Sequence, residues 1–244
     1  MSENLYAEHP EVYDALYARK DYDAETEFVV SRFEGRTETD GARPETGDRR
    51  ALVVGCGTGE HAKRLRDAGF EVLGVDKYPA MVERARTKSD AEFRVGTLPD
   101  LPVEGAFDLA WLPFTVVNHL RPDELAESLR AVADRLAAGG VLVFDEIATR
   151  GEGTGPRLKT YPADEGTYAR LTHVHEVGDS EYRWDSLVFT PDGEFFVDTH
   201  RLTDYDPEYL AGVCDALGLS VETYGWYDET AEPGEGGLFT FVAR

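Results

Sequence analysis

Residues 52–60 read Leu52-Val53-Val54-Gly55-Cys56-Gly57-Thr58-Gly59-Glu60, and this stretch is the most informative part of the chain about its fold. It continues a short apolar run, residues 51–54, which is typical of a strand buried on both faces. Glycines after a strand let the backbone approach a ligand closely, but a dinucleotide fingerprint needs a third glycine where this chain has Glu60. A carboxylate at a helix N-terminus also competes with a pyrophosphate for the same N–H groups. The stretch therefore favours a phosphate-free, cationic ligand, although a glycine-rich turn alone does not identify one.

The segments around this stretch alternate between strand and helix patterns. Strands are predicted at residues 51–54, 71–75, 91–95, 107–112 and 141–144. Helices are predicted at residues 60–68, 79–87 and 122–138, and Gly139-Gly140 is expected to end the last of them. A helix over 206–217 with Asp206 as its N-cap, and strands at 219–226 and 238–242, complete the pattern. This alternation predicts an open parallel sheet with helices on both faces.

Two regions depart from the alternation. Residues 11–33 have a helical pattern with a break at 20–22, and a polar segment over 35–50 is predicted to be a linker or long surface loop. From about Tyr161 to Tyr205 the pattern alternates with a period of two. Antiparallel strands are predicted there at 168–177, 181–190 and 194–202, with Pro191-Asp192-Gly193 as a hairpin turn.

The composition describes the environment of the protein and not its reaction. The chain has 244 residues with 25 Lys and Arg against 48 Asp and Glu, a formal net charge of −23. This excess disfavours nucleic acid and membrane surfaces as partners. Scattered acidic residues resemble those of halophile proteins, in which concentrated salt screens self-repulsion (Debye length about 3 Å at 1 M). An ordinary acidic cytoplasmic enzyme is the alternative.

The chain shows few signs of targeting or of metal binding. Its N-terminus lacks the basic and apolar regions of a signal peptide, and no apolar run reaches the length of a membrane helix, so we expect a cytoplasmic protein. Cys56 and Cys214 are too few for a disulfide framework or a metal cluster. His173 and His175 share a strand face, but no carboxylate or Cys spacing supports a metal site, so none is predicted.

Asp76 supplies a second signal for a nucleoside. It ends the second predicted strand, about twenty residues after Gly55, where an acidic side chain can accept both hydroxyls of a ribose. This position does not separate nicotinamide from other nucleosides. A surface Asp that caps the next helix is the alternative interpretation.

These motifs together resemble those of class I S-adenosylmethionine-dependent methyltransferases. The stretch 52–59 is similar to the first motif of that family, 76–81 to its acidic second motif and 107–110 to its strand-four motif. The third motif usually has Gly-Asp, whereas this chain has Gly96-Thr97, so adenine recognition there would depend on backbone N–H groups and the Thr97 hydroxyl. The resemblance implies a Rossmann-like, doubly wound α/β sheet of seven strands, the last antiparallel, with an antiparallel β insertion after strand five.

A narrower resemblance points to one subgroup. Residues 12–17 and 20–22, the closing run 236–239 and the β insertion are similar to nucleotide-sugar amine N,N-dimethyltransferases. Two features depart from that subgroup: Ile147-Ala148 stands where those enzymes have paired Trp, and Glu235-Gly236 stands where they have a nucleotide-binding Arg. The resemblance therefore implies the methyl-transfer reaction of that subgroup but not its sugar substrate.

The resemblance implies three regions and a set of site residues. The regions are a helical arm at 1–34 covering the cofactor, an S-adenosylmethionine-binding domain at 48–149 and 206–244, and a β insertion at 150–205 acting as a substrate lid and as the candidate homodimer contact. S-adenosyl-L-methionine is the expected cofactor and S-adenosyl-L-homocysteine its product. The predicted cofactor-binding residues are Tyr17, Tyr22, Gly55, Cys56, Gly57, Gly59, Asp76, Lys77, Met81, Thr97, Leu98 and Pro113.

Two residues are candidates for the chemistry of methyl transfer. An amine acceptor must lose a proton, and a base with a pKa near 7 accelerates such a step by about 10²–10⁴-fold. His119 follows the fourth predicted strand at its carboxyl end and is the candidate base, unless it only bonds its loop. Tyr13 is the candidate for orienting the substrate, unless it only packs in the helical arm.

The predicted function is methyl transfer from S-adenosylmethionine to a small-molecule acceptor, with an amine favoured. A non-catalytic nucleoside-binding module and an O- or C-methyltransferase remain alternatives, and a nicotinamide enzyme is a further one. No nucleic acid, membrane or metal partner is expected.

Overall fold

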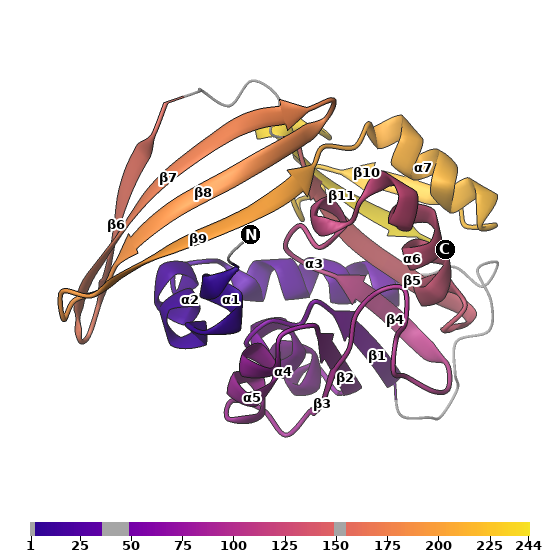
Figure 1. Ribbon diagram of the computed structural model, residues 1–244. Helices are drawn as coiled ribbons and strands as arrows, with labels where there is room; N and C mark the ends of the chain where they lie inside the picture. Colours follow the sequence, from indigo (N-terminus) through magenta and orange to yellow (C-terminus); the bar gives the residue numbers. More distant parts are fainter. Residues whose placement is uncertain (1–2, 36–48, 149–154) are drawn as a thin grey trace.

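The computed structural model describes residues 3–35, 49–148 and 155–244, and its framework is a seven-stranded sheet in the order β10-β11-β5-β4-β1-β2-β3 (Figure 1). Strands β1 to β5 of this sheet are parallel, and β11 runs antiparallel to both β5 and β10. The predicted Rossmann-like fold class is confirmed. The strands of this sheet are β1 (Arg49–Val54), β2 (Phe70–Asp76), β3 (Glu92–Val95), β4 (Phe107–Leu112), β5 (Leu136–Ile147), β10 (Val221–Tyr224) and β11 (Leu238–Ala243).

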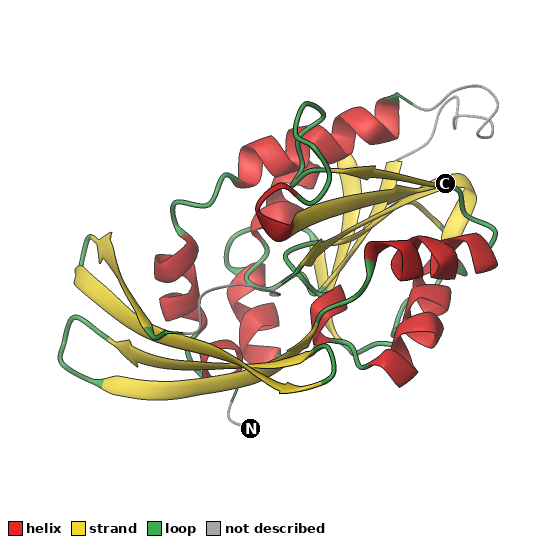
Figure 2. Ribbon diagram, turned by 90° about the horizontal axis from the view of Figure 1, so that it is seen from above, coloured by secondary structure: helices red, strands yellow, loops and turns green. Residues whose placement is uncertain are grey.

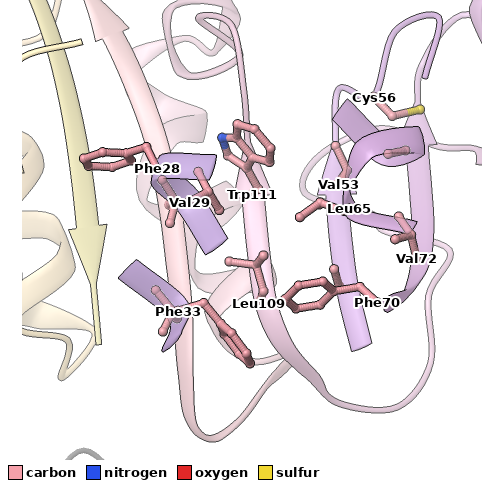
Figure 3. Packing of buried hydrophobic residues seen from close by; sticks show 14 of the residues in the cluster. Phe28, Val29, Phe33, Val53, Cys56, Leu65, Phe70, Val72, Leu109 and Trp111 are labelled. Carbon is pink, nitrogen blue, oxygen red and sulfur yellow. The ribbon is translucent and has the colours of Figure 1, made fainter. Parts of the chain in front are cut away.

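Helices cover both faces of this sheet, as the apolar strands require. One face packs against α3 (Tyr22–Glu34), α4 (Glu60–Asp67) and α5 (Pro79–Arg86). Figure 3 shows Phe28, Val29 and Phe33 of α3 on the same side of the sheet as Leu109 and Trp111 of β4. The other face packs against α6 (Pro122–Ala133) and α7 (Pro207–Ala216). Because each face buries its own apolar cluster, the strand ends are held in fixed positions.

One helix boundary predicted from the sequence is wrong. The amphipathic helix α6 ends at Ala133 and not at 138, and Gly139-Gly140 lies inside β5 instead of ending the helix. The reason is a long-range strand pairing: Leu136 already pairs with Phe107 of β4, and the register then shifts before Leu109. A Cβ on Gly140 would lie 3.0 Å from the Phe107 carbonyl oxygen, so the glycine permits this close pairing.

The predicted insertion forms a separate four-stranded antiparallel sheet in the order β6-β7-β8-β9 (Figure 2). Its hairpin turn at residues 191–193 is confirmed, but the sequence did not predict the first strand, β6. The inner face of the sheet packs on the N-terminal helices through Tyr168 and Val188. The elements are β6 (Arg157–Ala163), β7 (Gly166–Gly178), β8 (Glu181–Phe189), β9 (Phe195–Thr203), α1 (Asn4–Ala7) and α2 (Pro10–Tyr17).

Some expectations fall on residues that are not described. Residues 36–48 of the predicted linker and residues 149–154 at the start of the insertion lie outside the described ranges. Among the helices of the described ranges, none has the length and apolar character needed to span a bilayer.

Candidate active site

A cavity of about 370 Å³ opens at the carboxyl ends of β1, β2 and β4. The strand order reverses at β1, where doubly wound sheets bind their ligands. The arm (α1 and α2) and the inner face of the four-stranded sheet supply the remaining walls. The predicted residues that line the cavity are Tyr13, Tyr17, Gly55, Gly57, Asp76, Lys77, Met81, Thr97, Leu98, Pro113 and His119.

Two glycines after β1 shape the floor of the cavity. Gly55 has a φ of +70°, and a Cβ there would lie 2.3 Å from Val116 Cγ2. Gly57 has a φ of +52°, and a Cβ there would meet only the Tyr13 hydroxyl, at 4.0 Å. The absent side chain of Gly57 therefore leaves space between the loop and Tyr13 for a ligand.

Three predicted cofactor residues do not line the cavity. Cys56 is buried with its Sγ directed at Gly74, and burial raises the pKa of its thiol. Gly59 lies against Ala85, where a Cβ would approach to 2.9 Å, so it serves packing between α4 and α5. Tyr22 begins α3 and packs its ring on His61. The sequence could not separate these residues from their neighbours in the motifs.

Asp76 is the anchor at one end of the cavity. Its Oδ2 accepts a hydrogen bond from Gly57 N at 2.9 Å, and its Oδ1 accepts one from Tyr78 N at 2.9 Å. Burial raises the pKa of the carboxyl, and these amide donors oppose the rise. A carboxylate has about four lone-pair positions, so each oxygen can still accept a hydroxyl. Asp76 is held in one orientation, with the acceptor capacity that a ribose needs.

The edge of the cavity next to β3 is formed by small groups. Gly96 and Thr97 follow β3, and a Cβ on Gly96 would lie 2.3 Å from Pro102 Cδ. The exposed Thr97 hydroxyl bonds only the neighbouring Leu98 carbonyl, at 3.3 Å. Met81 and Leu98 add apolar side chains to this edge of the cavity.

An acidic group outside the cavity fixes the loop after β4. Phe114 and Thr115 have φ values of +59° and +65°, a conformation that costs energy for residues other than glycine. Asp145 holds them there: its carboxylate accepts hydrogen bonds from Phe114 N at 2.6 Å, from Thr115 N, and from the Tyr227 hydroxyl at 2.5 Å. Burial raises the pKa of Asp145 to about 7, although these donors oppose it. The loop carries Pro113 and leads to His119.

His119 lies at the other end of the cavity, beside a second histidine. Its ring centroid is 5.3 Å from that of His200 and 6.1 Å from that of Tyr6. Burial, with smaller contributions from His200 and Lys77, lowers the pKa of His119 to about 3. The imidazole is therefore neutral at physiological pH and offers a lone pair. His200 Nδ1 lies 3.4 Å from an oxygen of the buried Asp198.

Sequence reasoning missed the residues that the insertion contributes. Arg170, Trp184, His200 and Leu202 line the cavity from β7, β8 and β9, as does Tyr6 from the arm. The period-two alternation that places Tyr168 and Arg170 on one face was the available signal, but it did not reveal what that face covers. His173 and His175 do not line the cavity, and the described residues contain no group of three side chains able to hold a metal ion.

Comparison with known proteins agrees with this geometry. A methyltransferase domain family matches residues 51–140. A dTDP-3-amino-3,6-dideoxy-alpha-D-glucopyranose N,N-dimethyltransferase of Streptomyces fradiae is 29% identical over 181 residues, which are 70% of this chain and 70% of the relative. Two other curated relatives, both putative methyltransferases, are matched over 55% of their length, so the chain spans about half of each.

Two solved structures resemble this protein over nearly the whole chain. A sugar N-methyltransferase from Streptoalloteichus sp. superposes with a TM-score of 0.75 at 28% identity, covering 94% of this chain and 92% of that one. An S-adenosylmethionine-dependent methyltransferase from Clostridium acetobutylicum has a TM-score of 0.80 at 19% identity over 96% of both chains, which shows a shared fold. Residues 51–140 thus match a methyltransferase domain, and the chain as a whole shares the fold of an S-adenosylmethionine-dependent methyltransferase.

Proposed function

We propose that this protein transfers a methyl group from S-adenosylmethionine to an amine nitrogen of a small-molecule acceptor. The observation that carries the proposal is the single cavity that has Asp76 and the glycine floor at one end and two histidines at the other. Relatives named as N-methyltransferases of amino sugars support nitrogen as the attacking atom. The closure of the cavity by the arm and the four-stranded sheet supports a small acceptor over a macromolecule.

The residues of the cavity fit this cofactor. Asp76 would accept hydrogen bonds from the ribose hydroxyls of the cofactor. Gly57 would leave room for the methionine part of the cofactor between its loop and Tyr13, and Gly96 and Met81 would border the adenine. When bound, S-adenosylmethionine supplies a sulfonium methyl group whose leaving group is a neutral thioether. The protein must then orient the acceptor behind the methyl and exclude water, and orientation contributes about 7–11 kcal/mol in such reactions.

The neutral imidazole of His119 would accept a hydrogen bond from the amine of the methyl acceptor. The nitrogen lone pair of the acceptor forms the new N–CH₃ bond, the electron pair of the old S–CH₃ bond stays on sulfur, and the proton that the methylated nitrogen loses passes to solvent water. With a pKa of about 3, His119 accepts a hydrogen bond from the amine but does not retain the proton at neutral pH. Tyr13 would orient the acceptor, and Tyr17, whose ring packs 4.9 Å from that of Phe114, would cover the reacting atoms.

Titration calorimetry and a label-transfer assay together test the proposal. S-adenosylmethionine and S-adenosylhomocysteine should bind, and NAD should not compete with them. Labelled methyl should then appear in a nitrogen-linked product when the protein is given a pool of small amines. Tighter binding of NAD contradicts the cofactor assignment, and cofactor binding without any methyl transfer supports the alternative of a binding module. These assays should be run in concentrated salt, because the net charge of −23 suits a halophilic, cytoplasmic setting.

A further inference from the structure

Among the described residues, four charged side chains line the cavity, and Arg170 differs from the other three. Asp76 accepts two backbone N–H groups, Lys77 pairs with Glu3 at 3.3 Å, and Glu124 pairs with Arg121 at 3.3 Å. Arg170 forms no ion pair with any carboxylate of the described residues. Within the part of the chain that the structure describes, Arg170 is therefore the one cation of the cavity with no carboxylate at ion-pair distance.

The direct hydrogen-bond partners of Arg170 are neutral, although the buried Asp198 carboxylate attracts its charge from beyond ion-pair distance. The Arg170 side chain projects from β7 and the residue is 4% exposed. Its Nε donates to Ser186 Oγ at 2.9 Å, and its Nη1 donates to the Tyr17 hydroxyl at 3.1 Å. A guanidinium has five N–H donors and stays protonated in proteins, so three donors remain available. A buried cation is unfavourable unless an anion compensates it.

A second donor without a partner lies beside this guanidinium. The Trp184 ring, 5.7 Å from the guanidinium carbon, has a buried Nε1 that bonds nothing among the described residues. Trp184 also stacks on His200 at 6.0 Å, which places both donors next to the two histidines. The buried Asp198 carboxylate, which acts on Arg170 through space, accepts a hydrogen bond from Leu5 N at 3.1 Å and has its other oxygen 3.4 Å from His200 Nδ1. This wall of the cavity thus presents donors to an anion.

We propose that Arg170 binds a carboxylate of the methyl acceptor, so that the substrate is an amine that also bears a carboxylate, an amino acid in the broad sense. This inference rests on the proposed amine methylation. A single guanidinium matches one carboxylate, whereas a diphosphate would need further cations. The other cation that lines the cavity from residues 3–35, 49–148 and 155–244 is Lys77, which is already paired with Glu3. The carboxylate takes no part in the bond changes and is released unaltered on the methylated product.

Matched pairs of acceptors test the inference on the full-length protein. Glycine, β-alanine and 4-aminobutyrate are each compared with the alkylamine that has methyl in place of the carboxylate, namely ethylamine, propylamine and butylamine. The amino acids should exceed their matched amines in kcat/KM by about 30-fold or more, the range found when a buried charge gains its partner. In parallel, a small-molecule extract is separated on an anion exchanger at high pH, where amines are neutral, and each fraction is tested for methyl acceptance.

Two substitutions of Arg170 assign the preference to its side chain. Arg170→Gln should remove the difference between amino acid and matched amine. Arg170→Lys keeps the positive charge but loses the two parallel N–H donors of the guanidinium, so it should retain part of the preference for amino acids. A partial preference in this variant would show that the loss in Arg170→Gln does not come from a folding defect. Arg183→Gln is the control, because Arg183 lies on β8, pairs with Asp185 at 2.6 Å and does not line the cavity. Affinity for S-adenosylhomocysteine should be the same in all four proteins.

Three results would overturn the inference. One is an unchanged preference in a folded Arg170→Gln protein. Another is a weaker binding of S-adenosylhomocysteine in both Arg170 variants, which would assign the guanidinium to the cofactor. The third is methyl acceptance only in fractions that the exchanger does not retain. If the wild type binds S-adenosylhomocysteine but methylates no probe and no fraction, the proposed methyl transfer itself fails.

Discussion

The two ends of the cavity are built in different ways. The Asp76 end consists of loops that directly follow β1, β2 and β3, and its groups are mostly backbone amides, glycines and one carboxylate. The His119 end assembles side chains from α1, β7, β8 and β9, which are far apart in the sequence. Backbone groups recognise a ligand that never changes, whereas side chains can be exchanged without altering the fold. We therefore expect the first end to bind the cofactor and the second to select the acceptor.

Among the substitutions that test this difference between the two ends, the largest effect is expected at His119. The substitution His119→Ala should lower kcat about 100-fold. This is the lower end of the range of about 10²–10⁴-fold for general bases, because the lowered pKa of His119 limits it to accepting a hydrogen bond from the amine. The dissociation constant of S-adenosylmethionine should not change. Steady-state kinetics and calorimetry measure the two quantities. His175→Ala, outside the cavity, is the control, and an unchanged kcat would remove His119 from the chemistry.

The next effect is expected at the opposite end. Asp76→Ala should weaken S-adenosylmethionine binding about tenfold or more, since a buried charged acceptor and its bonds to the ligand are lost. Calorimetry measures the affinity, and Asp67→Ala, exposed at the end of α4, is the control. Equal affinities for the two variants would mean that the ribose lies elsewhere.

A smaller effect is expected at Glu146, which bonds Asn118, the residue before His119 in the chain. Buried Glu146 accepts hydrogen bonds from Asn118 Nδ2 and Tyr205 N, both at 3.3 Å, and burial raises its pKa from 4.5 to about 7. A raised carboxyl pKa in the folded state stabilises the protein at low pH, and this contribution is lost as the pH rises through about 7.

The corresponding measurement is the unfolding free energy of Glu146→Gln and wild type against pH. Between pH 4.5 and about 7 the wild type should lose stability more steeply, by up to about 1.4 kcal/mol per pH unit. Asp145, whose pKa burial also raises to about 7, remains in the variant, so a residual slope is expected. Parallel curves for the two proteins would contradict the assignment.

The smallest effect concerns the outer face of the four-stranded sheet. Leu158, Leu171, Leu187 and Val197 pair across all four strands, and Leu158 and Val197 are 64% and 50% exposed. We expect this apolar row to contact a second copy of the chain, as predicted for the insertion. Leu171→Glu should lower the sedimentation coefficient to that of a monomer with little change in kcat. Val95→Glu, at another exposed valine, is the control, and a monomeric wild type would refute the contact.

Local sequence patterns were sufficient to predict most elements of the fold. The apolar run before Gly55, the acidic residue after β2 and the hairpin at residues 191–193 were each predictable from neighbouring residues. The end of α6 was not, because Leu136 is drawn into β5 by its pairing with Phe107. Strand pairing with a distant segment outweighs a helical pattern, and no local signal reports it.

The candidate site divides in the same manner. The glycine floor and Asp76 were predictable, because turn geometry and strand-end chemistry require those residue types at those places. Arg170, Trp184 and His200 were not, because their approach to His119 depends on the register of β7, β8 and β9 and on how that sheet packs against α2. The periodicity of a strand determines which residues share a face. Only the packing of whole elements decides what that face meets, since burial is a property of the folded chain.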